Sequence, residues 1–133
     1  MKISVNNPCP CGSLTKYKLC CQKYHKGAKA KDALTLMKSR YSAYVHGDAK
    51  YIIKTTHPEN PEFQEDTKVW QKSIENFCSE NSFLGLEILS YEVQDEYSYV
   101  VFIASFGDRQ LYEKSRFVLN GDTWLYIDGE IKY

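Results

Sequence analysis

The sequence lacks the features that place a chain in a membrane or on a nucleotide. It has no apolar run near the roughly 18 residues that span a bilayer, and Met1 to Val5 do not begin the apolar core of a signal peptide. It contains neither a GxGxxG motif nor a phosphate-binding loop, and its 3 histidines are too scattered to form a catalytic zinc site. We therefore expect a soluble, cytoplasmic protein that does not contact a membrane.

Acidic residues are absent from the first part of the chain. Residues 1 to 31 contain 7 lysines and no Asp or Glu, so this segment carries +7. The whole chain holds 17 basic and 17 acidic residues, so the remainder holds 10 basic and 17 acidic residues and carries −7. This separation favours an anionic partner for the basic segment, but it fits equally well a basic segment that docks on its own acidic domain.

Cysteine is concentrated in the same segment, where 4 of the 5 lie within 13 residues: Cys9, Cys11, Cys20 and Cys21. So short and polar a segment cannot bury a core, and a reducing cytoplasm favours a metal over a disulfide as its stabiliser. Four thiolates suit a closed, structural Zn²⁺ site with Zn–S bonds of about 2.3 Å. Two alternatives stay open: His25 replaces Cys21 as a ligand, or Cys20 and Cys21 form a vicinal disulfide, which the Cys9-x-Cys11 pair disfavours.

Two parts of the chain resemble known families. Cys9-Pro10-Cys11-Gly12-Ser13, with eight residues between Cys11 and Cys20-Cys21, resembles the SEC-C zinc motif, named after the C-terminal tail of the preprotein translocase motor. Residues 36 to 48, LMKSRYSAYVHGD, and Thr56-His57-Pro58 resemble the bacterial YchJ-like family. This resemblance implies a knuckle followed by a domain similar to nuclear transport factor 2. In the translocase tail the knuckle contacts an acidic export chaperone, which implies an acidic protein partner for residues 9 to 31.

Helical periodicity predicts three helices. The first runs from an Asp32 cap to a Gly47 cap, the second begins at Asp48 and ends before Pro58, and the third covers about residues 66 to 79. We expect the third to present one apolar face in which Cys78 is inert packing. That face consists of Val69, Trp70, Ile74, Phe77 and Cys78.

Alternation then predicts four strands. Leu84, Leu86 and Ile88 hold one phase and Tyr91 and Val93 the other, so we expect a bulge near Leu89-Ser90. The next strands cover residues 97–106, 111–119 and 123–127, with turns at 95–96, 107–108 and 120–121. One core should contain Trp70, Ile74, Phe102, Phe117 and Trp124.

The predicted fold class is α+β, in which three helices pack on a curved antiparallel sheet and enclose a conical cavity, with an N-terminal zinc knuckle. A chain of 133 residues suffices for one compact domain with a small appendage. We therefore divide it into the knuckle with its linker, residues 1–31, and a nuclear transport factor 2-like domain, residues 32–133.

Several polar residues are candidates for the cavity: Arg40, Tyr44, His57, Glu113, Arg116, Tyr126 and Asp128. In an enzyme, His57 or Asp128 would act as general base, and Tyr44 or Tyr126 would donate to a developing oxyanion. No spacing forces two of these groups together, and strand tyrosines and Arg–Asp pairs are more often structural.

Two classes of function compete. In the first, the chain is a zinc-binding adaptor whose basic knuckle docks on an acidic protein or on RNA, while the second module binds a small-molecule ligand or forms a homodimer. In the second, it is a small-molecule-binding protein, hydrolase or isomerase that uses the cavity, and the knuckle only stabilises it. We favour the adaptor and leave catalysis open. RNA is the less favoured partner because the knuckle offers only Tyr17 and Tyr24 to stack on bases.

Overall fold

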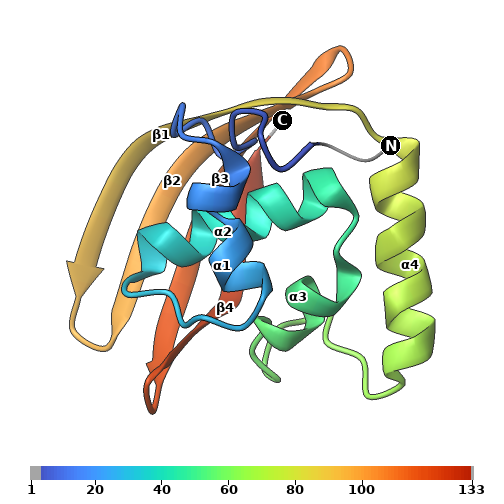
Figure 1. Ribbon diagram of the computed structural model, residues 1–133. Coiled ribbons are helices and arrows are strands. Elements are labelled where there is room, and N and C mark those ends of the chain that lie inside the picture. The colour runs from blue at the N-terminus through green and yellow to red at the C-terminus, as the bar shows by residue number, and fades with distance from the viewer. Residues whose placement is uncertain (1–3, 133) are drawn as a thin grey trace.

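A curved antiparallel sheet and the helices on one side of it form the body of the protein (Figure 1). The computed structural model describes residues 4–132, so residues 1–3, which include Lys2 of the basic segment, and Tyr133 lie outside the described residues. Within this range the strands follow one another in a meander: β1 (Phe83–Gln94), β2 (Tyr97–Phe106), β3 (Arg109–Asn120) and β4 (Thr123–Lys132). The longer helices are α2 (Ala33–His46), α3 (Ala49–Lys54) and α4 (Thr67–Glu80), and the N-terminal segment contains η1 (Tyr17–Leu19) and α1 (Gln22–His25). The predicted α+β class is confirmed.

The helices begin and end where the sequence predicts. Asp32, Asp48 and Asp66 each accept hydrogen bonds from backbone N–H groups of the first turn, at 2.7 to 3.2 Å. These carboxylates satisfy N–H groups that have no partner within the helix. α2 ends at Gly47, whose φ of 73° is left-handed. Within residues 4–132, every helix is too short or too polar to span a bilayer.

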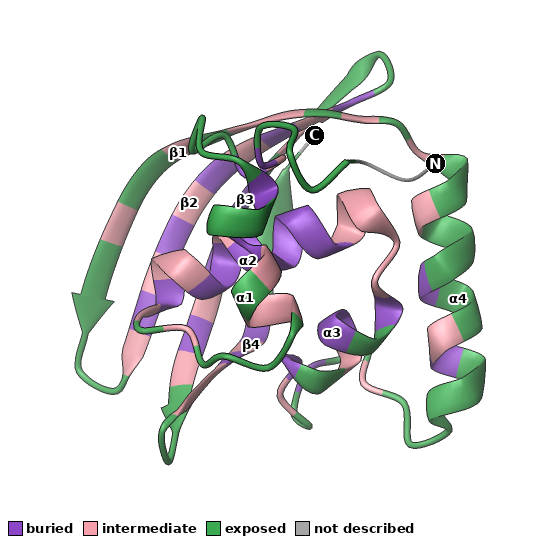
Figure 2. Cartoon of the chain, viewed as in Figure 1, coloured by how far each residue is buried: buried purple, intermediate pink, exposed green. Residues whose placement is uncertain are grey.

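α4 buries a narrower face than the sequence predicts. Trp70 and Ile74 are buried, but Val69 and Phe77 are 57% and 44% exposed, so the predicted apolar face is only partly covered. α4 contacts α3 and α2 at the edge of the molecule, and most of its surface is exposed (Figure 2). A helix that packs on one side only needs a narrow apolar stripe. Burial raises the pKa of Cys78 to about 11, which agrees with an inert thiol.

β1 changes phase twice along its length. Its pairing with β2 shifts between Ile88 and Ser90, which confirms the predicted bulge. It also shifts between Phe83 and Gly85. Beside this second irregularity Leu84 is 66% exposed, whereas Ile88 is half-buried. The expectation that the two side chains share one face of the strand is therefore not met.

β4 is longer than predicted. It continues to Lys132, so Asp128, which we expected to follow the last strand, lies within it. Residues 128 to 130 read Asp-Gly-Glu and break the apolar alternation, but β3 supplies the hydrogen-bonding partners that extend the strand. The β3–β4 turn is Gly121-Asp122 and not residues 120–121, because Asn120 pairs with Thr123.

The main core lies between the helices and the concave face of the sheet. Trp70, Ile74, Phe102 and Phe117 are buried in it, and Trp124 packs against it from a half-buried position. The inward side chains of β2 alternate strictly with half-buried outward ones. The predicted core is therefore confirmed, with Trp124 at its margin.

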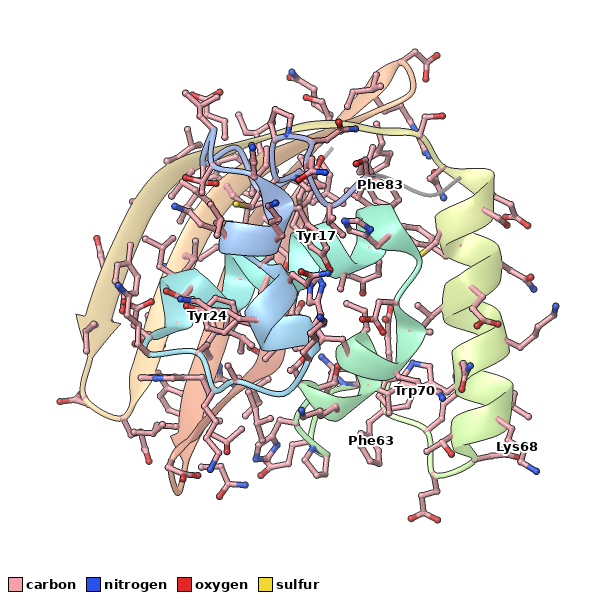
Figure 3. All side chains as sticks on the ribbon, viewed as in Figure 1. Tyr17, Tyr24, Phe63, Lys68, Trp70 and Phe83 are labelled. Carbon is pink, nitrogen blue, oxygen red and sulfur yellow. The ribbon has the colours of Figure 1, made fainter. Side chains whose placement is uncertain are left out.

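The N-terminal segment has its own small cluster and docks on α2. Tyr17 lies between this segment and α2 (Figure 3), and its hydroxyl donates to His25 Nδ1 at 2.6 Å. The other ring nitrogen, Nε2, donates to Ser39 O of α2 at 2.8 Å. The rings of Tyr17 and His46 are 4.3 Å apart. An ion pair between Lys29 and Asp122 adds a contact to the β3–β4 turn.

Candidate functional site

The four predicted ligand cysteines lie together in one cluster. The Sγ atoms of Cys9, Cys11, Cys20 and Cys21 all lie within 4.8 Å of one another, and those of Cys11 and Cys20 are 3.6 Å apart. Four bonds of about 2.3 Å to one central ion place the sulfurs about 3.8 Å apart in a regular tetrahedron. The cluster therefore fits a metal ion, and its cysteines carry no disulfide.

The local backbone places the two cysteine pairs. Pro8 forms a β-bridge with Lys16, and Cys9 N donates to Thr15 O at 2.8 Å, so the chain folds back on itself around the first pair. Gly12 takes a φ of 88° within this loop, a conformation that glycine adopts without strain. The second pair lies at the junction of η1 and α1, where Cys20 ends one element and Cys21 begins the next.

Two serine hydroxyls approach the sulfurs. Ser13 Oγ lies 3.2 Å from Cys20 Sγ, and Ser42 Oγ lies 3.7 Å from Cys9 Sγ. Hydroxyls in these positions can donate to thiolates, which spreads negative charge and orients the ligands. Ser42 belongs to α2, so the larger domain contributes directly to the surroundings of the cluster.

The thiols of Cys9, Cys11 and Cys21 do not ionise independently of one another. Hydrogen bonds from the side chains of Cys11 and Cys21 lower the pKa of Cys9. The hydrogen bonds that Cys21 makes with Cys11 and Cys9 raise its own pKa, and burial adds to the effect. One thiolate is thus stabilised by neighbours that keep their protons. A divalent ion that displaces those protons lets all four sulfurs ionise together.

His25 does not belong to the cluster. Both of its ring nitrogens are used, since Nδ1 accepts from Tyr17 and Nε2 donates to Ser39 O. Cys21 is the fourth member of the cluster. The arrangement therefore does not favour the alternative in which His25 replaces Cys21 as a ligand.

The surface around the cluster is basic and partly apolar. Residues 4–31 contain no carboxylate side chain, and their lysines are exposed: Lys16, Lys18, Lys23, Lys26, Lys29 and Lys31. Leu14 and Leu19 are 88% and 67% exposed beside two of these lysines. Leu14 also has a φ of 68°, which is uncommon for a residue with a side chain.

A cavity of about 710 Å³ lies between the helices and the concave face of the sheet. Most of its lining is aromatic or aliphatic, contributed by α2, α4 and all four strands. Five of the predicted candidates border it: Arg40, Tyr44, Glu113, Tyr126 and Asp128. A cavity of this size is typical of small-molecule sites.

Arg40 is a buried residue of α2 whose guanidinium lies at the C-terminal end of α3. Its Nη1 donates to Ile52 O at 3.1 Å and to the hydroxyls of Thr55 and Thr56 at 2.7 and 3.1 Å. A guanidinium there satisfies carbonyl and hydroxyl groups at the negative end of the helix dipole. The guanidinium also lies over the ring of Tyr126, 4.7 Å from its centroid.

Glu113 is buried on β3 and faces the cavity. Its Oε2 accepts from Tyr126 Oη at 3.0 Å and from the hydroxyl of Ser115. Burial raises the pKa of this carboxyl. The backbone of Gly129 passes beside it, and a Cβ there would lie 2.5 Å from Glu113 Oε2, so only glycine leaves room for the carboxyl group in this position.

The other candidates are placed differently. His57 does not line the cavity, because its backbone N–H donates to Tyr126 O at 2.8 Å and its Nδ1 accepts from Glu59 N. Arg116 points to the opposite face of the sheet, where it binds Asp128 in a bidentate pair at 2.9 and 2.6 Å. The expectation that His57 and Arg116 face the cavity is therefore wrong, and the Asp128 carboxylate is held by Arg116.

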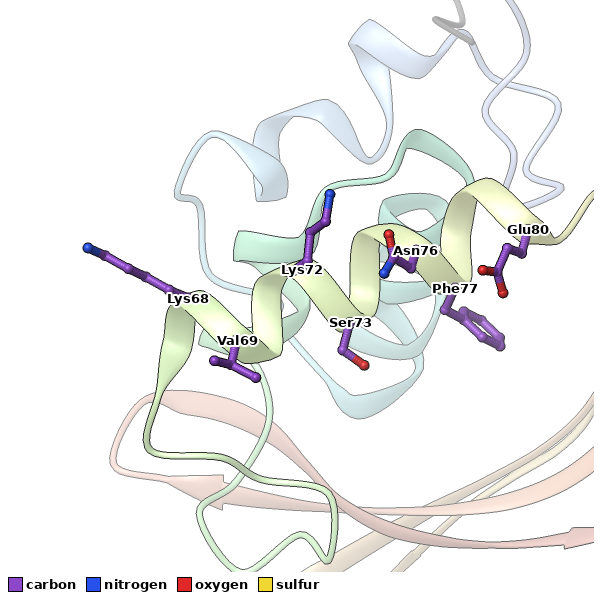
Figure 4. Close-up of a pocket in the computed structure, with 7 residues that line it drawn as sticks. All are labelled: Lys68, Val69, Lys72, Ser73, Asn76, Phe77 and Glu80. Atoms are coloured by element: carbon purple, nitrogen blue, oxygen red, sulfur yellow. The ribbon is translucent and has the colours of Figure 1, made fainter.

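A shallow groove of about 670 Å³ follows α4. Figure 4 shows Val69, Ser73 and Phe77 on one side of the helix, whereas Lys68 and Lys72 point away from that side. Ser73 and Phe77 also border the cavity, so this edge of α4 forms part of its rim.

The sequence did not indicate three residues of these sites: Ser42, Ser115 and Gly129. Two are small hydroxyl residues, whose role depends on a partner distant in sequence. The third could be suspected, because a glycine inside a strand often marks a close approach to the backbone.

Comparison with known proteins identifies both parts of the chain. Residues 6–23 match the SEC-C motif, and residues 32–129 match the family described as YchJ, middle NTF2-like domain. The chain is 37% identical over 130 residues to a UPF0225 protein of Xanthomonas oryzae, covering 93% of this chain and 95% of that protein. It is 36% identical over 142 residues to a UPF0225 protein of Bordetella pertussis, covering 99% and 100%.

Two solved structures share the fold over nearly the whole chain. A SEC-C motif containing protein from Psychrobacter arcticus has a TM-score of 0.78 at 29% identity, covering 97% of this chain and 85% of that one. A second SEC-C motif containing protein, from Rhodopseudomonas palustris, has a TM-score of 0.76 at 30% identity, covering 92% and 96%.

Proposed function

Because this chain belongs to the family of YchJ-type NTF2-like proteins and carries a SEC-C motif, we propose that it is a zinc-binding adaptor of the bacterial cytoplasm, whose knuckle docks on an acidic protein surface. The knuckle is the segment 4–31. Four thiolates and no further ligand position favour Zn²⁺ in a structural role. A reducing compartment keeps such thiols available for the metal.

The observation that carries the proposal is the pair of exposed leucines among exposed lysines. Leu14 and Leu19 lie in sequence on either side of Lys16 and Lys18, and all four side chains are exposed. Exposed apolar side chains rimmed by charge are typical of protein interaction sites. The lysines would attract an acidic partner, and the leucines would pack on it once it is bound.

The contacts of the knuckle with the larger domain leave its exposed leucines and lysines uncovered. The knuckle contacts α2 through Cys9, Tyr17 and His25, and these contacts do not use a lysine side chain. Of the lysines in residues 4–31, Lys29 forms an ion pair with the larger domain. The basic charge of the knuckle therefore stays largely available to a partner.

Burial of the tyrosines supports a protein partner over RNA. Tyr17 is 7% exposed, and Tyr24 packs against the main core. Binding of single-stranded RNA relies on aromatic faces that stack on bases. Tyr17 offers no such face, and that of Tyr24 is partly covered.

The test uses metal-loaded protein of residues 1–133 as bait in a bacterial lysate. The double variant Lys16→Glu with Lys18→Glu should lose a captured acidic protein, and rising salt should weaken capture by the wild type as the screening length falls below about 8 Å. The matched control is Lys68→Glu with Lys72→Glu on α4, which should capture normally. Capture that is insensitive to the knuckle variant would overturn the proposal, and loss of capture after nuclease treatment would replace it with RNA binding.

A further inference from the structure

The cavity contains two buried ionisable side chains that do not pair with each other. Arg40 is 7% exposed and Glu113 is 8% exposed, and neither takes part in an ion pair among residues 4–132. Tyr126 lies between them, with its ring under the guanidinium and its hydroxyl on the carboxyl group. Buried charges are normally paired, so a partner for one of them is missing from the protein part of the site.

Arg40 retains unused donors. A guanidinium carries five N–H groups in a planar fork. The described hydrogen bonds of Arg40 all use Nη1, and their acceptors are neutral. The side chain borders the cavity, so its remaining donors are available to a molecule inside it.

Glu113 is suited to donate to a ligand. Its Oε2 accepts from Ser115 and Tyr126, and no side chain of the described residues donates to Oε1. Burial is the main cause that raises the pKa of Glu113, and the hydrogen bonds from Ser115 and Tyr126 and the charge of Arg40 offset it only in part. In its acid form the carboxyl group carries a proton that it can donate.

We propose that the cavity binds a small organic carboxylate with an apolar body, and that Arg40 and Glu113 together bind its carboxylate group. A planar carboxylate matches the guanidinium fork. No lysine is found among the described residues that line the cavity, so a single negative charge suits it better than a phosphate dianion. The apolar body would pack on Trp70, Phe102 and Phe117. This proposal is independent of what the knuckle binds.

Other ligand classes fit less well. A cation would be repelled by Arg40, and a neutral ligand would leave the guanidinium without a counter-charge. The pair formed by Arg116 and Asp128 is already neutral. Glu62 also borders the cavity but is exposed, so it does not supply a buried counter-charge to the guanidinium.

Binding should weaken as the pH rises. The charged and titratable groups that face Glu113 are Arg40 and Tyr44 of α2, Glu62 of the α3–α4 connection, and Tyr126 of β4. The Asp128 carboxylate is bound by Arg116 on the opposite face of the sheet. Once Glu113 loses its proton, its negative charge lies beside that of the ligand, and the hydrogen-bond donor is gone. Protonation of the ligand itself lies at lower pH and weakens binding in the opposite direction, as the pH falls.

The experiment titrates metal-loaded protein of residues 1–133 with phenylpropionate, hexanoate and indoleacetate, and follows binding by amide chemical shifts. Phenylpropionamide and phenylpropylamine are matched neutral and cationic probes. We expect at least one carboxylate to saturate the cavity residues, with the amide at least about tenfold weaker and the amine absent from the site. Equal binding of the amide, tighter binding of the amine, or no saturation by any carboxylate at about 10 mM overturns the proposal.

Two variants assign the roles of the charged groups. Arg40→Gln should weaken carboxylate binding at least about tenfold. Arg40 also binds the end of α3, so this variant can fail to fold. In that case the proposal is tested by the pH dependence of Glu113→Gln. Its amide keeps a donor and carries no charge, so it should bind the carboxylate at neutral pH and lose the pH dependence seen in the wild type. An unchanged pH dependence in Glu113→Gln overturns the assignment to Glu113 whatever the outcome for Arg40→Gln.

Discussion

Replacing Trp70 with Ala tests how α4 is held on the rest of the domain. Trp70 is 5% exposed, and its ring centroid lies 5.2 Å from that of Phe63 at an interplanar angle of 69°. Figure 3 labels both residues. Truncating a buried tryptophan costs about 3–5 kcal/mol, and an aromatic pair adds about 0.5–1.5 kcal/mol to what burial alone provides. Trp70 borders the cavity, so the space left behind joins a volume that solvent can enter. This places the expected loss of unfolding free energy at about 3–4 kcal/mol.

The matched control is Trp124→Ala. Trp124 is only half-buried at the margin of the core, so we expect a loss of about 1–2 kcal/mol. The chain has 2 tryptophans, so each variant keeps one fluorescent reporter. With an m-value of about 2 kcal/mol/M in urea, Trp70→Ala should lower the unfolding midpoint by roughly 1.5–2 M. Midpoint shifts of equal size for the two variants would refute the packing described for α4.

Two further predictions concern the metal and the buried acid. Cys11→Ser should reduce zinc from about one equivalent to less than about half by elemental analysis, and chelation should speed amide exchange in α2 as well as in the knuckle, because Ser42 joins them. Glu113→Gln should gain stability over the wild type as pH rises above about 4.3, since the raised pKa of the folded Glu113 means that its ionisation costs stability. A difference between the two urea midpoints that stays constant across pH would contradict this.

The elements of the fold were predictable because their determinants are local. An aspartate cap and a left-handed Gly47 bound α2 in the sequence as they do in the structure. The bulge at Leu89 followed from a change of apolar phase, which needs no tertiary information. β4 was underestimated because its last residues are polar and owe their strand conformation to pairing with β3.

The metal cluster and the cavity differ in how far sequence reasoning could reach. Cysteine spacing within one short segment specifies its own cluster. The cavity is lined by α2, α4 and all four strands. The pairing register of the strands decides which of their side chains face inward. Glu113 and Arg116 are three residues apart on one strand, and therefore lie on opposite faces of the sheet. His57 was misplaced for a similar reason, since the pairing of its backbone N–H with Tyr126 O is a long-range contact.

The stability of the fold does not require the buried polar groups of the cavity. Arg40 has a structural role at the end of α3, but that role uses one nitrogen of the guanidinium. Glu113 has no comparable role, because its partners are Ser115 on its own strand and Tyr126 on the next, and both are held by the sheet without it. Apolar residues of similar volume commonly replace buried charged groups with no loss of stability. The backbone at Gly129 nevertheless leaves room for this carboxyl group where a Cβ would clash with it. A site that keeps a buried acid and an unpaired guanidinium against their cost of burial is one that selects a ligand.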